Sequence, residues 1–273
     1  MKAVMVTNLH KENSRLITDT VCERLAALSV TLLDDRDENI KICDFVIAVG
    51  GDGTIIHAAK NAAFHSKPVL GINNGRLGFM AGLEPSELSR LDALITGRYT
   101  LQNLMMLKVT VESKGGEKQL FCLNDAVVSK GALSRIIDIS VDCDRQSLIR
   151  YRADGLIVST PTGSTAYSLS AGGPVVDPAV SSILITPICP HSLISRSIVV
   201  NPDAQIEINA SRETSIDGDN DIFLTIDGEQ SLPLAPGDTV TVCRAGDVTA
   251  KLCRIKDENF YVAIKSKMTE RLD

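Results

Sequence analysis

The sequence is poor in the features that mark nucleic-acid-binding proteins. It has no tryptophan, and aromatic residues make up only 4% of its 273 residues, which leaves few rings to stack on bases. Its 28 basic residues are outnumbered by 34 acidic ones, giving a formal net charge of -6. Non-specific binding to nucleic acid needs a basic surface that displaces counterions. We therefore expect no nucleic-acid partner.

Long apolar runs are also missing. Every apolar stretch is short and interrupted by glycine, proline or charge, so the sequence predicts no membrane span and no membrane partner. Residues 1–7 are too short and too polar at their flanks for a signal peptide. The seven cysteines are odd in number and form no C-x-x-C pair, which favours buried thiols in a reducing compartment. We expect a cytoplasmic protein.

The chain changes character near residue 100. Before that point, apolar strand-like runs alternate with segments of helical spacing, an order typical of βαβ units around a parallel sheet. These expected elements cover residues 3–7, 13–28, 45–49, 54–64, 68–72 and 85–96. After it, short runs of alternating apolar and polar residues are separated by glycine-containing turns. We predict an α/β domain over residues 1–100 and a β-rich domain over 101–273, and leave open that the extreme C-terminal segment packs back on the first.

Residues 50–54, with the sequence GGDGT, follow the expected buried strand and precede a helix. Glycines allow the backbone to turn tightly and approach a ligand, and the first N–H groups of a helix form a natural phosphate site. The segment has neither the lysine of a P-loop nor the G-x-G-x-x-G dinucleotide pattern. The Asp52 carboxylate is costly among phosphates unless it holds a metal or accepts a proton from an attacking group. Taken alone, the segment also fits a plain strand-to-helix turn capped by Asp52.

Two further segments place polar groups at the ends of expected strands. Residues 154–167 run from an apolar strand into a loop rich in serine and threonine, whose hydroxyl groups suit ribose and phosphate oxygens. Asn124 and Asp125 follow the apolar run 120–123, and an amide beside a carboxylate is able to grip a vicinal diol. On their own, the first also fits a loop with Ser and Thr caps, and the second a turn or strand end.

With these segments, the chain resembles the bacterial-type NAD kinases along nearly its whole length. The matching residues are 50–54, 73–79, Asn124 with Asp125, 154–167, 187–193 with Arg196, and Asp227 with Gly228. The GGDGT segment is shared more widely with diacylglycerol, sphingosine and phosphofructokinases. The resemblance therefore implies a diacylglycerol kinase-like and phosphofructokinase-like fold for the α/β domain with its parallel sheet. Residues 154–167 and 187–196 are more specific to NAD kinases.

The resemblance implies that the protein transfers the γ-phosphate of ATP to the 2′-hydroxyl of the adenosine ribose of NAD, giving NADP. Asp52 is then the catalytic base, and late acceptance of the hydroxyl proton suffices in a loose transition state. The implied phosphate and ATP contacts are Gly51, Gly53, Thr54 and Arg76. The implied NAD contacts are Asp52, Gly53, Phe79, Asn124, Asp125, Arg152, Asp154, Thr162, Thr165, Ala166, Tyr167 and Asp227.

The resemblance also implies a divalent cation, Mg²⁺ or Mn²⁺, held mainly through the phosphates of ATP, and a homodimer or homotetramer.

Three residues depart from the family pattern: Asp125 replaces the usual Glu, Arg76 replaces His, and Met80 stands where an aromatic residue is common. The shorter Asp125 side chain reaches about one methylene less toward a ribose, which favours a weaker or a water-mediated contact. The alternatives are a lipid or other alcohol kinase of the same superfamily and a non-catalytic dinucleotide-binding regulator.

Overall fold

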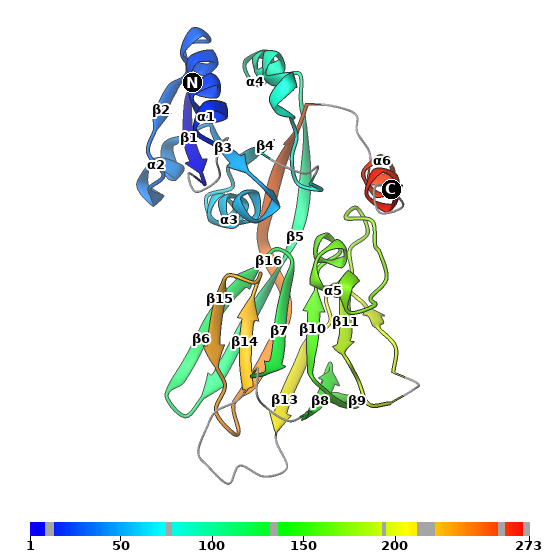
Figure 1. The fold of residues 1–273 in the computed structure, drawn as a ribbon. Coiled ribbons are helices and arrows are strands. Elements are labelled where there is room, and N and C mark those ends of the chain that lie inside the picture. The colour runs from blue at the N-terminus through cyan, green and yellow to red at the C-terminus, as the bar shows by residue number, and fades with distance from the viewer. Residues whose placement is uncertain are drawn as a thin grey trace. The chain divides into compact units, whose positions relative to one another are not determined.

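The computed structural model describes residues 1–8, 14–74, 78–131, 136–192, 195–211, 222–255 and 260–269. The chain forms two compact units (Figure 1): unit 1 contains Met1–Leu104 and Val248–Asp273, and unit 2 contains Met105–Asp247. Strands β5 (Thr100–Ser113) and β16 (Thr239–Arg254) each run from one unit into the other. The sequence predicts a boundary near residue 100, whereas the division lies at residue 104 and returns at residue 248.

Unit 1 is built on a parallel sheet in the order β2-β1-β3-β4, to which the end of β16 is added. Its first four strands are β1 (Lys2–Thr7), β2 (Thr31–Leu33), β3 (Phe45–Gly50) and β4 (Pro68–Asn73). Strand β3 pairs in parallel with both β1 and β4, and all its residues are buried. A central strand covered on both faces needs such a continuous apolar run. The α/β class and the parallel sheet predicted from the sequence are therefore confirmed.

Three predicted helical stretches of unit 1 occur in the predicted order with different ends, whereas the helices over residues 37–42 and 260–269 are not predicted from the sequence. The helices of unit 1 are α1 (Ser14–Ala27), α2 (Asp37–Ile42), α3 (Asp52–Ala63), η1 (Pro85–Leu91), α4 (Asp92–Thr96) and α6 (Phe260–Thr269). The predicted helix 85–96 begins as a 3-10 helix and ends at Gly97, whose φ of 71° suits glycine. In α1, Val21 and Leu25 are buried, while Leu16 is exposed despite its helical spacing.

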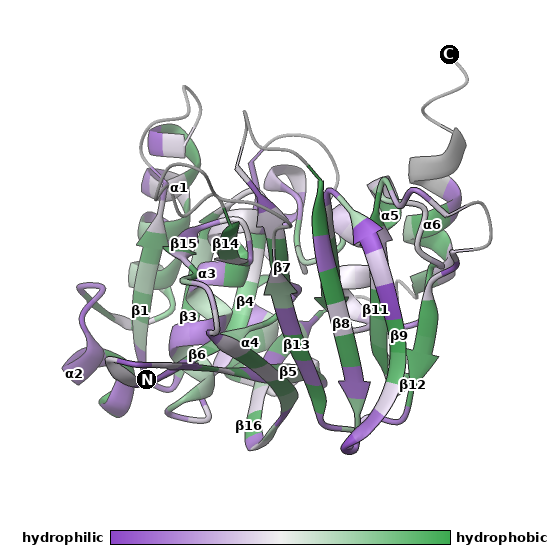
Figure 2. Cartoon of the chain, turned by 90° about the horizontal axis from the view of Figure 1, so that it is seen from below, coloured by the Kyte–Doolittle hydropathy of each residue, from purple (hydrophilic) through white to green (hydrophobic). Residues whose placement is uncertain are grey.

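Unit 2 consists of two sheets whose strand pairs are antiparallel, such as β10 with β7 and β13 with β8. One hydrophobic cluster joins the sheets and contains Val128 and Leu156 of one and Ile139 and Val141 of the other. Strand β8 alternates between buried and half-buried residues, and its green and purple bands in Figure 2 show the matching alternation of hydrophobic and hydrophilic residues. This confirms the predicted β-rich second domain. Besides parts of β5 and β16, the elements are β6 (Gly116–Cys122), β7 (Asp125–Lys130), β8 (Ile137–Cys143), β9 (Gln146–Ala153), β10 (Gly155–Ser159), η2 (Thr162–Thr165), α5 (Tyr167–Ser170), β11 (Ile183–Ile188), β12 (Ile198–Val200), β13 (Ile206–Ser211), β14 (Ile222–Ile226) and β15 (Gln230–Pro233).

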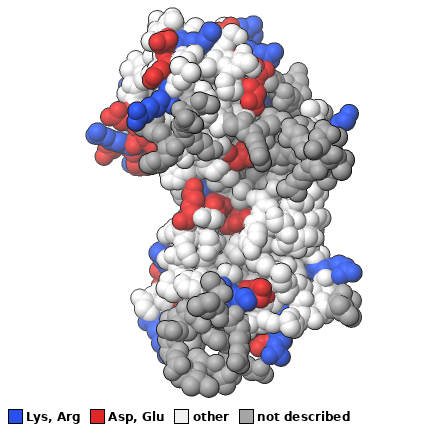
Figure 3. Space-filling view, viewed as in Figure 1, with Lys and Arg blue, Asp and Glu red and all other residues white. Residues whose placement is uncertain are grey.

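The charged side chains on the described surface are mixed in sign. On the face shown in Figure 3, blue Lys and Arg lie among red Asp and Glu, and the described residues of that face form no continuous basic area. Among the described helices, none combines the length and the apolar character that crossing a membrane requires. The cysteines do not all follow the prediction of buried thiols, because Cys43, Cys122 and Cys253 are buried while Cys189 is exposed.

Candidate active site

The GGDGT segment lies at the carboxyl end of β3, the edge of a parallel sheet where ligands bind in open α/β folds. Gly51 is extended, with φ −85° and ψ −178°, and α3 begins at Asp52, two residues before the predicted start. A Cβ atom on Gly50 would collide with the Thr54 side chain, so glycine is required there. At Gly53, an added Cβ would meet no described atom within 4 Å. The first turn of α3 therefore leaves room for a ligand beside Gly53.

The Asp52 carboxylate binds backbone N–H groups that lie 27 and 28 residues further along the chain. Its Oδ2 accepts a hydrogen bond from the Phe79 N–H at 3.1 Å, and its Oδ1 accepts one from the Met80 N–H at 3.2 Å. A Cβ atom on Gly78 would collide with Oδ1 of Asp52, so this approach also depends on glycine. The structure thus brings together Asp52 and Phe79, two residues that the sequence predicts to share a site.

Arg254, at the end of β16, binds the other side of the same backbone segment. Its guanidinium donates from Nη2 to the carbonyl oxygen of Phe79 (3.1 Å) and from Nη1 to those of Met80 (3.4 Å) and Ala81 (2.9 Å). Its Nε donates to Oε1 of Gln102 at 2.9 Å. Arg254 is not predicted from the sequence, since no motif surrounds it and three of its acceptors are backbone carbonyls.

The two asparagines of the matching segment 73–79 bind protein groups. The Asn73 amide donates to both carboxylate oxygens of Glu84, at 3.1 and 3.0 Å. The Asn74 side chain donates to Oγ of Ser14 at 2.5 Å, and its backbone N–H donates to the carbonyl of Gly50 at 3.0 Å. These residues join the end of β4 to the GGDGT segment. Arg76, a predicted phosphate contact, lies outside the described residues.

In unit 2, Asp227 holds the turn that carries Asn124 and Asp125. Its carboxylate accepts hydrogen bonds from the backbone N–H groups of Leu123 (3.1 Å), Asn124 (2.8 Å) and Asp125 (3.1 Å). Asp227 itself has a φ of 49°, in the left-handed region that Asp tolerates better than most residues. Three predicted site residues are therefore brought together, with Asp227 bound to the backbone of the other two.

Asp125 is a buried carboxyl group, with 4% of its surface exposed. Burial, and secondly the negative charge of Asp227, raise its pKa from 3.8 to about 7. It pairs in register with Ser159 of β10, whose buried hydroxyl has no hydrogen-bond partner within the described part of the chain. A carboxyl group that is protonated part of the time near neutral pH is able to donate as well as accept a hydrogen bond.

The hydroxyl-rich loop is tied to the same turn. The Thr160 hydroxyl donates to the carbonyl of Leu123 at 2.6 Å, and the Thr160 N–H donates to that of Asn124 at 2.9 Å. Gly163 lies against Asn124 so closely that a Cβ atom would collide with the Asn124 carbonyl. The predicted contact Thr162 is buried within this loop, and Thr165 donates its hydroxyl to the Thr162 carbonyl at 3.2 Å. Two further predicted contacts follow the loop: Ala166 is half-buried and Tyr167 is exposed.

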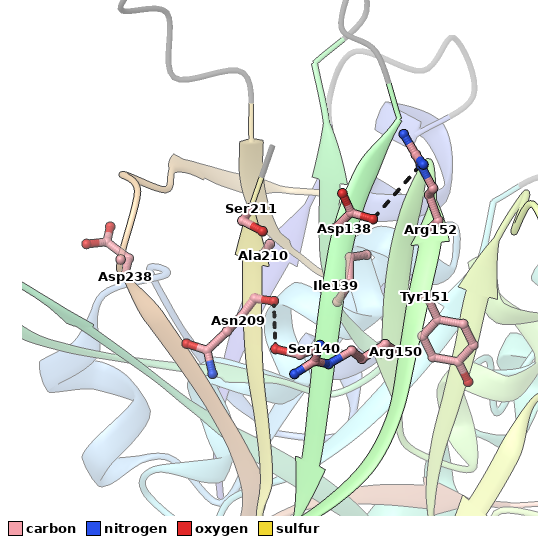
Figure 4. A pocket seen from close by; sticks show the side chains of 11 residues that line it. Asp138, Ile139, Ser140, Arg150, Tyr151, Arg152, Asn209, Ala210, Ser211 and Asp238 are labelled. Atoms are coloured by element: carbon pink, nitrogen blue, oxygen red, sulfur yellow. Dashed lines mark hydrogen bonds and ion pairs between the residues drawn. The ribbon is translucent and has the colours of Figure 1, made fainter. Parts of the chain in front are cut away.

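Arg152 and Asp154 have separate ion-pair partners in unit 2. Asp154 pairs with Lys130 at 3.0 Å, and Arg152 lies 4.0 Å from Asp138. Arg152 and Asp138 point toward each other from β9 and β8 at a depression of about 540 Å³ (Figure 4). Tyr151, the residue before Arg152 in β9, belongs to the hydrophobic cluster that joins the two sheets of unit 2. Since successive residues of a strand point to opposite faces, Arg152 projects from the outer face of its sheet.

Asp125, in contrast, faces the side of β7 that carries Val127, in a small cluster apart from the shared core. Arg152 and Asp125 therefore project from different sheets, each away from the core between them. The structure does not bring these two predicted NAD contacts together within one chain. Residues 193 and 194 of the matching segment 187–196 lie outside the described residues.

A glycine-rich turn at the carboxyl end of a parallel strand, followed by a helix start with open space, defines an α/β protein of the phosphate-binding class. Residues 3–99 match the family model of the ATP-NAD kinase N-terminal domain, and residues 123–255 match that of the ATP-NAD kinase C-terminal domain. The chain belongs to the ATP-NAD kinase family.

Individual relatives agree with this assignment. The chain is 45% identical to an NAD kinase of Symbiobacterium thermophilum over 228 residues, covering 83% of this chain and 78% of the relative. It is 41% identical to an NAD kinase of Moorella thermoacetica over 269 residues, covering 97% and 83%. The family resemblance inferred from the motifs is thereby confirmed.

Solved structures support the fold. The yeast NADH kinase complexed with NADH matches with a TM-score of 0.88 at 24% identity, covering 98% of this chain and 87% of that one. An NAD kinase from Archaeoglobus fulgidus in complex with ATP matches with a TM-score of 0.75 at 26% identity, covering 97% and 99%. The predicted α/β domain followed by a β-rich domain is thus an arrangement found in NAD kinases.

Proposed function

We propose that the protein is an NAD kinase that transfers the γ-phosphate of ATP to the 2′-hydroxyl of the adenosine ribose of NAD, giving NADP and ADP. Family membership supports the overall reaction. The observation that carries the chemical assignment is the position of Asp52, a carboxylate at the first residue of α3 inside the GGDGT turn. In this proposal the carboxylate lies where phosphates bind. It is therefore suited to accept a proton from an attacking hydroxyl group, and capping the helix is not its only role.

In this proposal, Asp52 orients the 2′-hydroxyl and accepts its proton late in the transfer. The 2′-oxygen forms a bond to the γ-phosphorus, the bond from that phosphorus to the β,γ-bridging oxygen breaks, and ADP leaves. A carboxylate is too weak a base to remove a ribose proton before attack, but a loose transition state does not require this. Gly51, Gly53 and Thr54 cradle the phosphates with backbone N–H groups, helped by the positive end of the α3 dipole.

The described residues do not form a metal site of their own. They contain no group of three or more His, Cys, Asp or Glu side chains suited to an ion. As the family resemblance implies, Mg²⁺ or Mn²⁺ would bind mainly through the phosphates of ATP and spread their negative charge.

Unit 2 supplies the remaining NAD contacts in this proposal. Asn124 and Asp125 bind ribose hydroxyls, with Asp227 fixing the turn that carries them. Phe79 of unit 1 lines the adenine pocket, and Arg76 and Arg152 contact phosphates. The remaining proposed NAD contacts are Asp154, Thr162, Thr165, Ala166 and Tyr167.

The test is a coupled assay in which a strictly NADP-dependent dehydrogenase detects product from ATP, Mg²⁺ and NAD. We expect Asp52→Asn to reduce kcat by roughly 100-fold or more, because loss of a general base costs about 10²–10⁴-fold. The exposed Asp34 of the same unit supplies a matched control, Asp34→Asn, which is expected to keep wild-type turnover. Wild-type turnover in Asp52→Asn would contradict the assignment of the base.

Two further measurements, a competition assay with diacylglycerol and calorimetry with NAD, separate the alternative functions. A lipid or other alcohol kinase would phosphorylate diacylglycerol in competition with NAD, and a non-catalytic regulator would bind NAD in calorimetry without forming NADP from any donor. Sedimentation of the protein tests the homodimer or homotetramer that we propose by analogy with the family. Cell fractionation tests the proposed cytoplasmic location.

A further inference from the structure

Residues 78–81 pass between two opposite charges in unit 1. On one side, the Asp52 carboxylate accepts the N–H groups of Phe79 and Met80 at 3.1 and 3.2 Å. On the other side, the Arg254 guanidinium donates to the carbonyl oxygens of Phe79, Met80 and Ala81 at 3.1, 3.4 and 2.9 Å. The Asp52 carboxylate and the Arg254 guanidinium are therefore connected through the backbone groups of this segment.

One peptide group takes part in both sets of contacts. The peptide bond between Phe79 and Met80 directs its C=O to Arg254 and its N–H to Asp52. Its dipole is thus aligned between a positive and a negative charge, and hydrogen bonds to charged groups are stronger than neutral ones. Each contact polarises the peptide in the direction that strengthens the other. The guanidinium on one side therefore reinforces the N–H donors that hold Asp52 on the other.

The guanidinium has the shape that this position requires. Nη1, Nη2 and Nε each donate, and Nε is directed to Gln102 Oε1 at 2.9 Å, which orients the plane of the group. A lysine ammonium is a compact charge without a planar fork and does not reproduce three carbonyl contacts from one position. Phe79 is also in contact with the ring of Phe260, at a centroid separation of 6.4 Å.

We propose that Arg254 is a positioning residue of the kinase: through the backbone of residues 79–81 it holds two N–H donors against Asp52 and fixes the backbone that carries the Phe79 ring. Arg254 does not itself contact substrate in this assignment. The inference rests on the role proposed for Asp52 in the transfer reaction. It adds to that role a residue of β16 that is distant in the sequence.

Amide hydrogen exchange tests the positioning directly and does not depend on the reaction. We expect Arg254→Lys to accelerate exchange at the Phe79 and Met80 amides by about 10-fold or more, because these N–H groups lose the segment's anchor. Arg98→Lys is the matched control, since Arg98 is an exposed arginine of the same unit that pairs with Asp92. Unchanged exchange at both amides in Arg254→Lys would overturn the proposal.

Enzyme kinetics provide a second test of the role proposed for Arg254. We expect Arg254→Lys to lower kcat by roughly 10- to 100-fold, since a misplaced catalytic group costs about that much, with a smaller change in KM for ATP. In Arg254→Gly, added guanidinium ion is expected to restore part of the lost kcat, which a purely structural defect would not allow. Wild-type kcat in Arg254→Lys, or no recovery with guanidinium, would overturn the proposal. An inactive wild-type protein would instead contradict the proposed function, while the exchange result stood on its own.

Discussion

Asp125 is the residue with the most unusual protonation among those of the proposed site. It is buried near Asp227, whose carboxylate accepts hydrogen bonds from three backbone N–H groups. Burial and the neighbouring charge raise the pKa of Asp125 from 3.8 to about 7. The group therefore changes charge near physiological pH, at a position where the family usually has the longer Glu.

This raised pKa predicts a stability change with a definite sign. Below pH 3.8 the Asp125 carboxyl is protonated in both states, and between pH 4 and 7 only the unfolded chain loses the proton. Stability therefore falls as pH rises through this range and is flat above it, a loss of roughly 4 kcal/mol at about 1.36 kcal/mol per pKa unit. We expect the stability of Asp125→Asn relative to wild type to increase between pH 4.5 and 7 and to stay level from there to pH 8.5 in urea unfolding. A difference independent of pH, like that expected of Asp34→Asn, would contradict this.

At the residue scale, the sequence identifies groups whose chemistry is local. Asp52 is predicted because a carboxylate in a phosphate-binding turn is costly unless it has a chemical task, and the family resemblance then implies that it acts as the base. Arg254 is not predicted, because three of its acceptors are backbone carbonyl oxygens more than 170 residues away. Every residue has a backbone carbonyl, so the sequence does not indicate which ones an arginine binds. Asp227 is found only in part: its place in the site is predicted, but its hold on the Asn124 backbone depends on the pairing of β7 with β14.

At the scale of elements, the close approach of Gly78 to Asp52 makes a prediction about the segment between β4 and η1. A Cβ atom there would collide with the carboxylate, so Gly78→Ala has to move either the segment or Asp52. We expect kcat to fall by roughly 100-fold, the cost of misplacing a reacting group by about 1 Å. Gly115→Ala is the control, because its Cβ would make an ordinary contact of 3.7 Å with Ser113. The coupled assay measures kcat of both variants. Equal rates would contradict the prediction, because they would mean that the segment moves without disturbing Asp52.

The type and order of the elements in unit 1 follow from periodicity, but their ends do not. A fully apolar run marks β3, and the spacing of Leu88, Leu91 and Leu94 marks a helical stretch. The start of α3 moves back to Asp52 because Gly51 is extended and serves as the cap, a backbone choice that side-chain pattern does not report. The 3-10 geometry of η1 is likewise invisible to spacing, since its apolar residues also satisfy a helix of 3.6 residues per turn.

At the scale of the whole molecule, the acidic balance predicts how the protein depends on metal. A chain with a net charge of -6 has to bind two polyphosphorylated nucleotides. Backbone N–H groups at the GGDGT turn supply only partial charges, so we propose that a divalent cation balances the charge of the phosphates. We expect activity to be lost in excess EDTA and restored by Mg²⁺ in the coupled assay. A full rate in excess chelator would contradict this account of the electrostatics.

The division of the chain into units is the feature that sequence texture describes least well. The change of pattern near residue 100 reflects a real transition, because β5 leaves unit 1 there. The return at residue 248 lies in the middle of β16, where the alternation of buried residues is interrupted over residues 243–249 and Gly246 has a φ of 62°. The sequence-based division places no boundary there, and the pairing of Lys251 and Leu252 with β4 shows that the end of β16 belongs to the sheet of unit 1.

Unit 2 is an insertion within unit 1, and this has a consequence for synthesis of the protein. Asp52 and residues 78–81 emerge from the ribosome before any part of unit 2, whereas Arg254 follows Phe79 by 175 residues. At about 5–20 residues per second, that interval is roughly 10 to 35 seconds. During this time the nascent chain carries its phosphate turn without the arginine that anchors the neighbouring segment. The site in unit 1 is therefore completed only after the ribosome has translated all of unit 2.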